Sequence, residues 1–309
     1  MVRDADQRIR PLARHTPVFT STSLNRAAGL EVHFKCENLQ RGGAFKIRGA
    51  SNLIFSIPDE DLSRGVVAFS SGNHAQAVAI AAERAGTKAT IVMPADAPKG
   101  KLDATRNHGA RIITYDRHRE SREAIAEQLL KETGATLVPP FDHALVMAGQ
   151  GTAALELLEV IPHLEAFIAP IGGGGLLAGC ATIAKVLNPD IRIFGAEPER
   201  ANDTFLSLQA KKRIEIPMPD TIADGLRSPQ PGALTFPILQ RHVEKVLLVT
   251  EDEIRQTVKF LLMRMKLLVE PSGAVAAAAV LHQKLPKNLR SIGVILSGGN
   301  LDFEDLARY

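Results

Sequence analysis

The chain has 309 residues, of which 45% are apolar and 23% charged, so its composition is globular and its length allows two domains. Its net charge of +3 is small and Trp is absent, which argues against a nucleic-acid-binding surface. The polar N-terminus is unlike a signal peptide, no apolar run reaches membrane-spanning length, and the two cysteines, Cys36 and Cys180, are too few for a disulfide framework. We therefore expect a cytoplasmic protein without a nucleic-acid or membrane partner.

The first part of the chain alternates apolar runs typical of buried strands with segments of helical spacing. Strands are predicted over 66–69, 89–93, 111–115 and 135–138, and helices over 74–85, 101–107 and 119–132. This alternation predicts an α/β fold with a parallel sheet covered on both faces. We assign these elements to a small, mobile domain of residues 52–145.

A second α/β series begins near Gly149. Its helices are predicted over 152–160, 176–187 and 250–266, and its strands over 166–171, 191–196, 246–249 and 292–296. Thr250 and Glu253 form a capping box at the start of the third helix. The N-terminal segment is expected to pack with this series, so residues 1–51 and 146–309 form the predicted large domain.

Four consecutive glycines, residues 172–175, join an apolar strand directly to a helix. Such a turn presents backbone N–H groups at the positive end of the helix dipole, which favours a phosphate group. A dinucleotide site is a second interpretation, because Gly173, Gly175 and Ala178 match the G-x-G-x-x-A fingerprint and Glu197 stands where a ribose-binding acid belongs. The pattern alone leaves both a phosphorylated cofactor and NAD open.

Two polar turns and one lysine favour the first interpretation. Residues 70–74 (Ser-Ser-Gly-Asn-His) and 297–300 (Ser-Gly-Gly-Asn) each follow a predicted strand, where open α/β sheets bind ligands. Lys46 stands at the expected start of a helix. A lone lysine is usually a solvated charge, but beside a phosphate site and these turns it becomes a candidate for a Schiff base with a carbonyl cofactor. A NAD site leaves these features unexplained.

Together these segments resemble the fold-type II pyridoxal-phosphate enzymes, specifically the serine/threonine dehydratase and serine racemase group. The resemblance spans almost the whole chain and rests on residues 16–17, 37–40, 45–50, 172–175, 221–225, 270–273 and 297–302. It implies a two-domain fold similar to tryptophan synthase β, a homodimer, and pyridoxal 5'-phosphate in the cleft between the domains.

The resemblance also implies roles for individual residues. Lys46 would carry the cofactor as an imine, Phe45 would pack against its ring, Asn73 would bond the ring hydroxyl and Ser297 would face the pyridine nitrogen. The residues implied for the phosphate and the rest of the cofactor site are Gly172, Gly173, Gly174, Gly175, Leu176 and Gly225. The residues implied for the amino-acid substrate are Ser71, Asn73, His74, Arg122 and Ser228.

The reaction implied is β-elimination from a 3-hydroxy amino acid of the serine or threonine type, which gives a 2-oxo acid and ammonia. Lys46 would act as the general base at Cα. An amino-acid racemase is the alternative, because Ser71 stands where racemases of this family place a second, catalytic proton relay. The residues at positions 74–76 resemble those of the dehydratases more than those of the racemases, so dehydration is the favoured activity.

Three further features of the sequence bear on the substrate, on a metal ion and on regulation. Ala44 stands where the family usually has serine, so 3-hydroxyaspartate and phenylserine are alternative substrates. Glu197, the Ala201 carbonyl and Asp203 resemble the family's divalent-cation loop, which implies Mg²⁺ or Ca²⁺. The sequence ends at Tyr309, without the C-terminal regulatory domain of biosynthetic threonine dehydratases, so a catabolic or racemase-type enzyme is expected.

Overall fold

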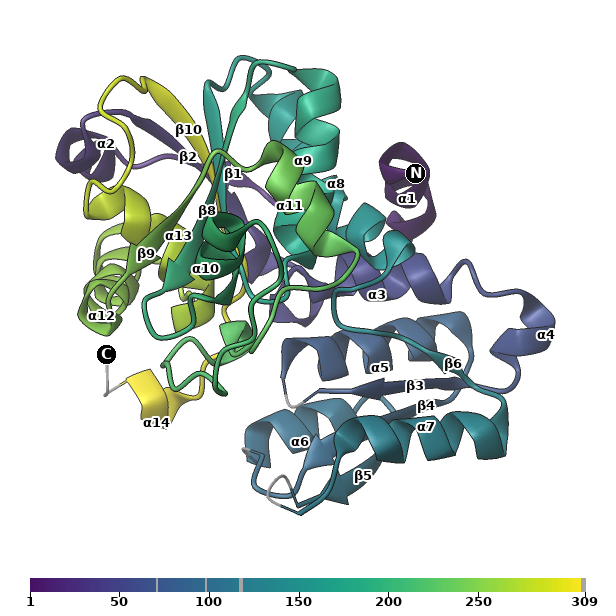
Figure 1. Cartoon of the computed structure of the whole chain (residues 1–309). Coiled ribbons are helices and arrows are strands. Elements are labelled where there is room, and N and C mark those ends of the chain that lie inside the picture. The colour runs from purple at the N-terminus through teal and green to yellow at the C-terminus, as the bar shows by residue number, and fades with distance from the viewer. Residues whose placement is uncertain (71, 98, 117–118, 307–309) are drawn as a thin grey trace.

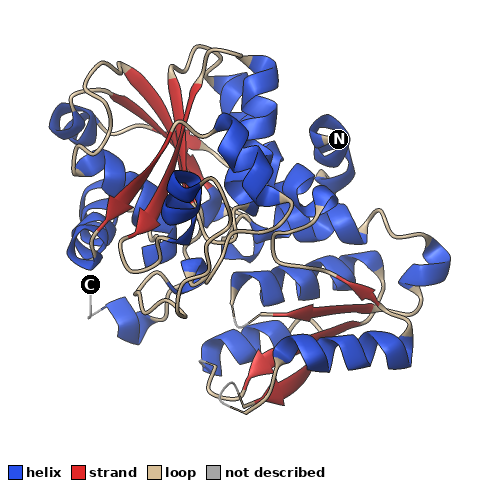
Figure 2. Ribbon diagram, in the orientation of Figure 1, coloured by secondary structure: helices blue, strands red, loops and turns tan. Residues whose placement is uncertain are grey.

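The computed structural model describes residues 1–70, 72–97, 99–116 and 119–306, and these fold around two separate sheets flanked by helices (Figures 1 and 2). The larger sheet lies at the upper left of Figure 1 and the smaller one at the lower right. Ser71, a predicted catalytic residue, lies outside the described residues. Within the described ranges, no helix combines the length and the apolar character needed to cross a membrane.

The smaller sheet has the strand order β5-β4-β3-β6, and its neighbouring strands are all parallel. Its elements are β3 (Val66–Phe69), β4 (Ala89–Pro94), β5 (Arg111–Tyr115), β6 (Thr136–Leu137), α4 (Asp59–Leu62), α5 (Asn73–Ala85), α6 (Lys99–Arg106) and α7 (Arg122–Thr133). The chain leaves β3 toward β4 and returns to β6 on the other side of β3. The carboxyl ends of β3 and β6 therefore border a topological switch point, where open α/β sheets bind ligands.

The larger sheet has the order β1-β2-β10-β7-β8-β9. Its strands are β1 (Val18–Phe19), β2 (Glu31–Cys36), β7 (Ala166–Pro170), β8 (Arg192–Pro198), β9 (Lys245–Val249) and β10 (Ser291–Leu296). Only the β1–β2 pair is antiparallel. The strands β7, β8 and β9 follow one another outward, whereas β10 returns to the other side of β7. A second switch point therefore lies between β7 and β10, where residues 172–175 and 297–300 begin.

Helices cover both faces of the larger sheet. They are α1 (Val2–Ile9), α2 (Thr22–Ala28), α3 (Lys46–Ile54), α8 (Ala144–Val160), α9 (Gly175–Leu187), α10 (Asp203–Ala210), α11 (Thr235–His242), α12 (Glu251–Phe260), α13 (Pro271–Leu281) and α14 (Phe303–Leu306), with short 3-10 turns at Glu37–Leu39, Arg41–Gly43 and Asp224–Leu226. The helix α13 contacts β7, β8, β9 and β10 and is buried from Pro271 to Val280, which explains why its sequence is apolar on all sides.

The expected strands are present, and the helices differ mainly at their ends. The helix predicted over 152–160 begins earlier, at Ala144, and includes Gly149 and Gly151. The helix α7 begins at Arg122, because the Ser121 side chain caps it by accepting a hydrogen bond from the backbone of Ala124. The helix predicted over 250–266 is α-helical only to Phe260 and ends in a π-helical turn, Leu261–Met265. The sequence analysis also missed β1 and β2.

Candidate active site

Lys46 is the first residue of α3, and its half-buried amine reaches the segment that follows β6. Its Nζ donates a hydrogen bond to the carbonyl oxygen of Pro140 at 2.7 Å and lies 5.1 Å from the centre of the Phe45 ring. Burial disfavours the charged form and lowers the pKa of the Lys46 amine to about 8. More of this amine is therefore neutral and nucleophilic near pH 7 than of a solvated lysine.

The start of α3 is attached to the turn that follows β10. The backbone N–H of Phe45 donates to the Ser297 carbonyl at 3.0 Å, and Ala44 forms an antiparallel bridge with Gly298. Ala44 is only 2% exposed, and its Cβ faces Gly298. Position 44 therefore packs against this turn, which also brings Ser297 (3% exposed) next to the lysine segment.

Asn73, the first residue of α5, has an amide held in one orientation. Its Nδ2 donates to Glu270 Oε1 at 2.6 Å, and its Oδ1 accepts from Asn300 Nδ2 at 2.8 Å. Asn300 Nδ2 also donates to the Gly42 carbonyl at 2.7 Å. Asn300 thus links the turn of the larger sheet to the first helix after β3. The contact with Glu270 uses one of the two N–H groups of Asn73, which leaves the other for a ligand.

His74 is buried beside Asn73, and its Nε2 lies 2.8 Å from the Val138 carbonyl oxygen, just beyond β6. Burial, and to a smaller extent the charge of Lys46, lowers the pKa of the imidazole to about 3. His74 is therefore neutral near pH 7. Val138 stands two residues before Pro140, the acceptor of the Lys46 amine, so both side chains bond to the same short segment.

The tetraglycine connects β7 to α9 by a tightly packed turn. Gly174 has a φ of 91°, a left-handed conformation that glycine adopts without strain. A Cβ added to Gly173 would lie 2.3 Å from the ring of Phe141, so a side chain has no room there. The first N–H groups of α9, from Gly175 onward, have no acceptor within the helix and form an anion-binding end.

Two more of the predicted site residues, Gly225 and Leu176, adjoin the tetraglycine, whereas Ser228 is bonded to another part of the chain. The Gly225 carbonyl lies 3.3 Å from the position of a Cβ on Gly172, so Gly225 is adjacent to the tetraglycine. Leu176 is the buried second residue of α9. Ser228 is buried and donates to the Gln230 carbonyl at 2.9 Å.

Arg122, at the first position of α7, is not held by the tetraglycine or by the lysine segment. Its Nε pairs with Glu123 at 2.8 Å, and its guanidinium lies 5.2 Å from the centre of the Phe69 ring. Phe69 is the last residue of β3, so Arg122 lies at the same carboxyl edge of the smaller sheet as residues 70–74.

Two buried carboxylates flank the loop between β8 and α10: Glu197 lies in β8, and Asp203 is the first residue of α10. Glu197 accepts hydrogen bonds from the backbone of Thr204 at 3.1 Å and Phe205 at 2.9 Å. Neither carboxylate oxygen of Asp203 has a hydrogen-bond partner among the described residues. Burial raises the pKa of Asp203 to about 7, and burial together with the nearby Asp203 raises the pKa of Glu197 well above its usual value.

Comparison with known proteins identifies the family. Residues 9–298 match the family model described as pyridoxal-phosphate dependent enzyme. The chain belongs to this enzyme family. It is 47% identical to the L-threo-3-hydroxyaspartate ammonia-lyase of Saccharomyces cerevisiae, over 99% of this chain and 94% of the relative, and 45% identical to the serine racemase of Dictyostelium discoideum, over 99% and 96%.

Solved structures agree with this assignment. The maize serine racemase structure has a TM-score of 0.96 at 44% identity and covers 99% of this chain and 94% of its own. A threonine deaminase structure, from T.th., has a TM-score of 0.91 at 42% identity, with 98% of each chain covered. These similarities confirm the predicted fold-type II architecture and the predicted family.

Membership of the pyridoxal-phosphate-dependent enzymes favours a phosphorylated cofactor over NAD. Glu197, the ribose-binding acid of the NAD interpretation, is fully buried and accepts hydrogen bonds from the backbone of the first turn of α10. The residues present instead fit a phosphorylated aldehyde. An amine with a pKa of about 8 can bond to its carbonyl carbon, and the glycine turn at the start of α9 can hold its phosphate.

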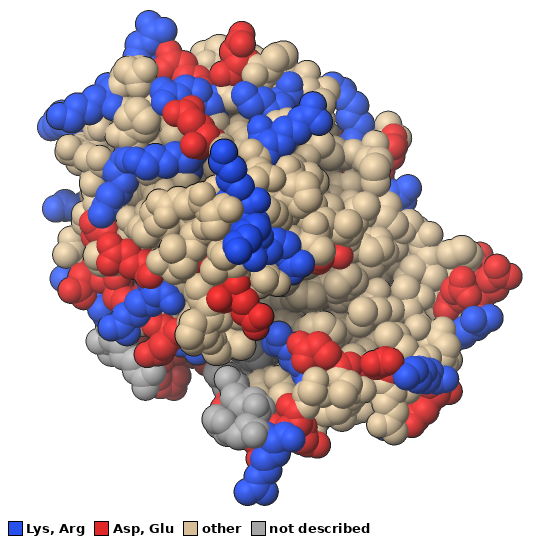
Figure 3. All heavy atoms as spheres, in the orientation of Figure 1, with Lys and Arg blue, Asp and Glu red and all other residues tan. Residues whose placement is uncertain are grey.

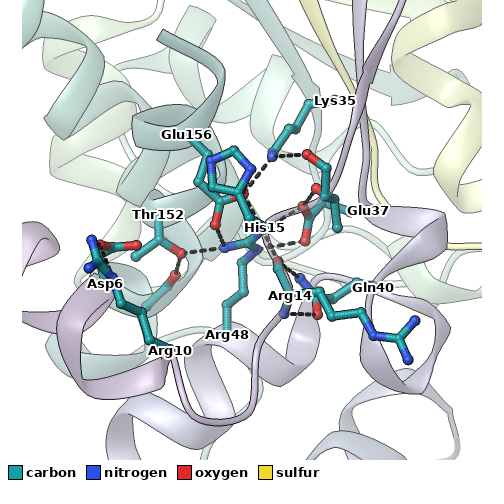
Figure 4. A network of polar contacts seen from close by, with 12 residues as sticks. Asp6, Arg10, Arg14, His15, Lys35, Glu37, Gln40, Arg48, Thr152 and Glu156 are labelled. Atoms are coloured by element: carbon teal, nitrogen blue, oxygen red, sulfur yellow. Dashed lines mark hydrogen bonds and ion pairs between the residues drawn. The ribbon is translucent and has the colours of Figure 1, made fainter. Parts of the chain in front are cut away.

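Sequence reasoning missed a buried ion network next to the lysine of this enzyme (Figure 4). Arg48, two residues after Lys46 and 0% exposed, bonds to Glu37 at 2.7 and 2.8 Å and to Glu156 at 2.6 and 2.8 Å. Lys35 is also buried and pairs with Glu156. Burial opposes ionisation of Glu37, but Arg48 outweighs it and holds the pKa of this carboxyl below its usual value. Glu156 stands between two leucines in an apolar stretch, a signal that could have revealed the network.

Proposed function

We propose that the enzyme is an ammonia-lyase that converts a 3-hydroxy amino acid to a 2-oxo acid and ammonia by β-elimination of the hydroxyl group. The observation that carries the proposal is the Lys46 amine, which burial holds at a pKa of about 8. Relatives named for this type of reaction support it. Besides the yeast enzyme, they include an L-threonine ammonia-lyase of Geobacter sulfurreducens, 43% identical over 99% of this chain and 76% of the relative.

Bound pyridoxal phosphate supplies the electron sink that stabilises negative charge at Cα. In our proposal Lys46 would hold the cofactor and, once its amine is free, would remove the Cα proton as general base. Phe45 would pack against the ring, Asn73 would donate its second N–H to the ring hydroxyl, and Ser297 would face the pyridine nitrogen. Because Ser297 is neutral, it does not retain a proton there, and this suits elimination better than transamination.

The rest of the proposed cofactor site holds the phosphate through backbone N–H groups. It consists of Gly172, Gly173, Gly174, Gly175, Leu176 and Gly225. For the substrate carboxylate we propose Ser71, Asn73 and His74, with Arg122 and Ser228 as further contacts. His74 is neutral because of its low pKa, so it can orient the substrate but cannot act as a general acid near pH 7.

A screen for ammonia release tests the proposal. The holoenzyme is incubated with the stereoisomers of serine, threonine, 3-hydroxyaspartate and phenylserine, and the preferred substrate should be one of these. Lys46→Ala should lower the rate by about 10³-fold, because it removes both the attachment point and the base. A holoenzyme that releases ammonia from none of these compounds would contradict the proposal.

Amino-acid racemisation is a second candidate activity, because several close relatives are named serine racemase. It requires a proton relay on the face of the substrate opposite Lys46, and Ser71 is the proposed relay. Ser71→Ala should abolish formation of the other enantiomer while elimination largely survives. Equal loss of both activities would show that Ser71 serves substrate binding instead.

We further propose that Glu197, the Ala201 carbonyl and Asp203 bind Mg²⁺ or Ca²⁺. The support is chemical: two unpartnered, buried oxygens of Asp203 lie beside a second buried carboxylate, and a hard cation would neutralise both. The described residues contain no group of three or more His, Cys, Asp or Glu suited to a metal, so this site would depend on two carboxylates, one carbonyl and water.

Cation binding should stabilise the folded enzyme. At about 100 times the Kd, Mg²⁺ or Ca²⁺ should add about 2.7 kcal/mol to the free energy of unfolding, measured with and without a chelator. Asp203→Asn should abolish this gain, whereas Asp252→Asn, at an exposed carboxylate of α12, should retain it. A gain of the same size in both variants would place the cation elsewhere.

The domain boundaries, the dimer and the location remain proposals. We propose a large cofactor-binding domain of residues 1–51 and 146–309 and a small, mobile domain of residues 52–145. This division keeps each sheet within one domain. Figure 3 shows a hollow in the surface where the two parts meet, with acidic and basic side chains interspersed around it. A homodimer is proposed by family resemblance, and light scattering would measure it. The cytoplasmic location stays a prediction.

A further inference from the structure

Gln150 lies in the middle of α8, the helix packed between the lysine helix α3 and the phosphate-side helix α9. Glycines on either side allow unusually close helix packing. A Cβ on Gly149 would lie 2.3 Å from the Arg48 carbonyl oxygen of α3, and a Cβ on Gly151 would lie 2.6 Å from the Gly179 carbonyl oxygen of α9. These contacts hold Gln150 at a fixed position between the two helices.

The Gln150 side chain leaves α8, passes beside α3 and reaches the tetraglycine. Its Cγ lies 3.1 Å from the position of a Cβ on Gly49, one turn along α3 from Lys46. Its Oε1 lies 2.7 Å from the position of a Cβ on Gly175, the first residue of α9. The terminal amide is therefore next to the glycine turn, at the end of α9 where the N–H groups are free.

The amide itself is buried and unpaired. Gln150 is 1% exposed, and neither Oε1 nor Nε2 has a hydrogen-bond partner among the described residues. Buried amides are nearly always hydrogen-bonded, because leaving one unpaired costs folding free energy. An amide without a partner, beside an anion-binding helix end, indicates that its partner is the ligand.

We propose that Gln150 is an additional cofactor-binding residue, whose side-chain N–H donates a hydrogen bond to the phosphate group held at the tetraglycine. No protein partner among the described residues fixes which end of the amide faces the turn, so its NH₂ group is free to turn toward a phosphate oxygen. A hydrogen bond to a charged phosphate is stronger than one between neutral groups. The inference rests on the tetraglycine being the phosphate site and does not depend on the lyase activity.

Two variants separate this role from a structural one. Gln150→Met keeps the length and removes the polar atoms, whereas Gln150→Glu keeps the shape and adds a negative charge. The Kd of the apoprotein for pyridoxal 5'-phosphate should rise about tenfold in the Met variant, and further in the Glu variant. The Kd for pyridoxal, which lacks the phosphate, should stay within about twofold for the Met variant. Gln128→Met, on the exposed side of α7, is the matched control and should change neither value.

Inorganic phosphate distinguishes failure of this inference from failure of the site itself. Phosphate should raise the unfolding temperature of the wild-type apoprotein and lose this effect in Gln150→Glu. No effect on the wild type would show that the tetraglycine does not bind phosphate. An equal effect on both would overturn the role of Gln150, as would equal weakening of pyridoxal and its phosphate.

A measurement on the unmodified protein covers the case in which the variants do not fold. In a crystal structure of the wild-type holoenzyme, the Gln150 amide nitrogen should lie within about 3.2 Å of a phosphate oxygen. A separation too long for a hydrogen bond, or an amide that bonds only to protein atoms, would overturn the proposal.

Discussion

Lys46 and His74 contact the same segment after β6, and burial has shifted the pKa of both in the same direction. The pKa of Lys46 falls to about 8 and that of His74 to about 3. Of these two side chains, only the lysine can therefore exchange a proton near neutral pH. This agrees with Lys46 as the base and with His74 as a neutral group that orients the substrate.

Attachment of the cofactor should follow the titration of Lys46. Only the neutral amine attacks an aldehyde, so the rate of pyridoxal phosphate incorporation into the apoprotein should rise with pH and level off above about 8. For an amine at the ordinary lysine pKa of about 10.4, the rise would continue beyond about pH 10. Stopped-flow absorbance of the bound chromophore measures this rate.

The Lys46→Ala variant provides the baseline for this experiment, because other amines also react with the aldehyde. Its slower absorbance change is subtracted at each pH. A corrected rate that still increases about tenfold between pH 9 and 10 would show that the amine is not buried as the structure indicates.

Individual site residues were predictable where they stand in a recognisable local pattern. The tetraglycine, Asn73 and Ser297 each follow a strand, and this position is visible in the sequence. The contacts that orient Asn73 were not predictable, because Glu270 and Asn300 come from distant parts of the chain. The substrate role of Arg122 stays a prediction, and its observed partner is Glu123.

The helices α3, α8 and α9 form a layer that sets the distance between Lys46 and the tetraglycine. Their contacts run through Gly149, Gly151 and Gly179, where side chains are absent. Glycine is a poor helix former, and the predicted helix began only after the first two of these glycines, at Thr152. Close helix packing outweighs that propensity, and the helix begins at Ala144 instead.

Gly149→Ala should weaken both the fold and the cofactor site. Its Cβ would clash with the backbone of Arg48, so α8 must move away from α3, at a cost of about 1–3 kcal/mol in the free energy of unfolding. The same movement separates Lys46 from the tetraglycine and should raise the Kd for pyridoxal phosphate. Urea unfolding and a cofactor titration measure the two effects.

Gly86→Ala is the matched control for this change. Gly86 has a φ of 71° and no neighbour near its Cβ position, so alanine there strains the backbone without a clash. It should cost roughly 1–2 kcal/mol of stability and leave the cofactor Kd unchanged. A normal cofactor Kd in Gly149→Ala would show that the helix spacing does not control the site.

The two-sheet plan of the molecule was largely predictable, and the strand order was not. Alternating strands and helices revealed both α/β series, because each strand is an apolar run between turns. The position of β10 between β2 and β7 is set by pairing across the whole chain, which local patterns do not report. The antiparallel β1 was missed because it has only two residues.

The buried network of Arg48, Glu37 and Glu156 links α3, the 3-10 turn at Glu37–Leu39 and α8. Arg48→Met would leave two buried carboxylates without their main partner, and should lower the free energy of unfolding by about 3–5 kcal/mol. Arg255→Met, at an exposed pair with Asp252, should cost no more than about 1 kcal/mol. Similar losses in both variants, measured by urea unfolding, would refute a special role for the network.

The four residues from Val138 to Phe141 contact three parts of the proposed site: His74, Lys46 and the tetraglycine. Val138 holds the His74 ring, Pro140 holds the Lys46 amine, and Phe141 lies against Gly173. The two prolines in this strap, Pro139 and Pro140, have restricted backbone angles, so it transmits displacement instead of absorbing it. A displacement of the smaller sheet would therefore move the acceptor of the Lys46 amine and the neighbour of the glycine turn together.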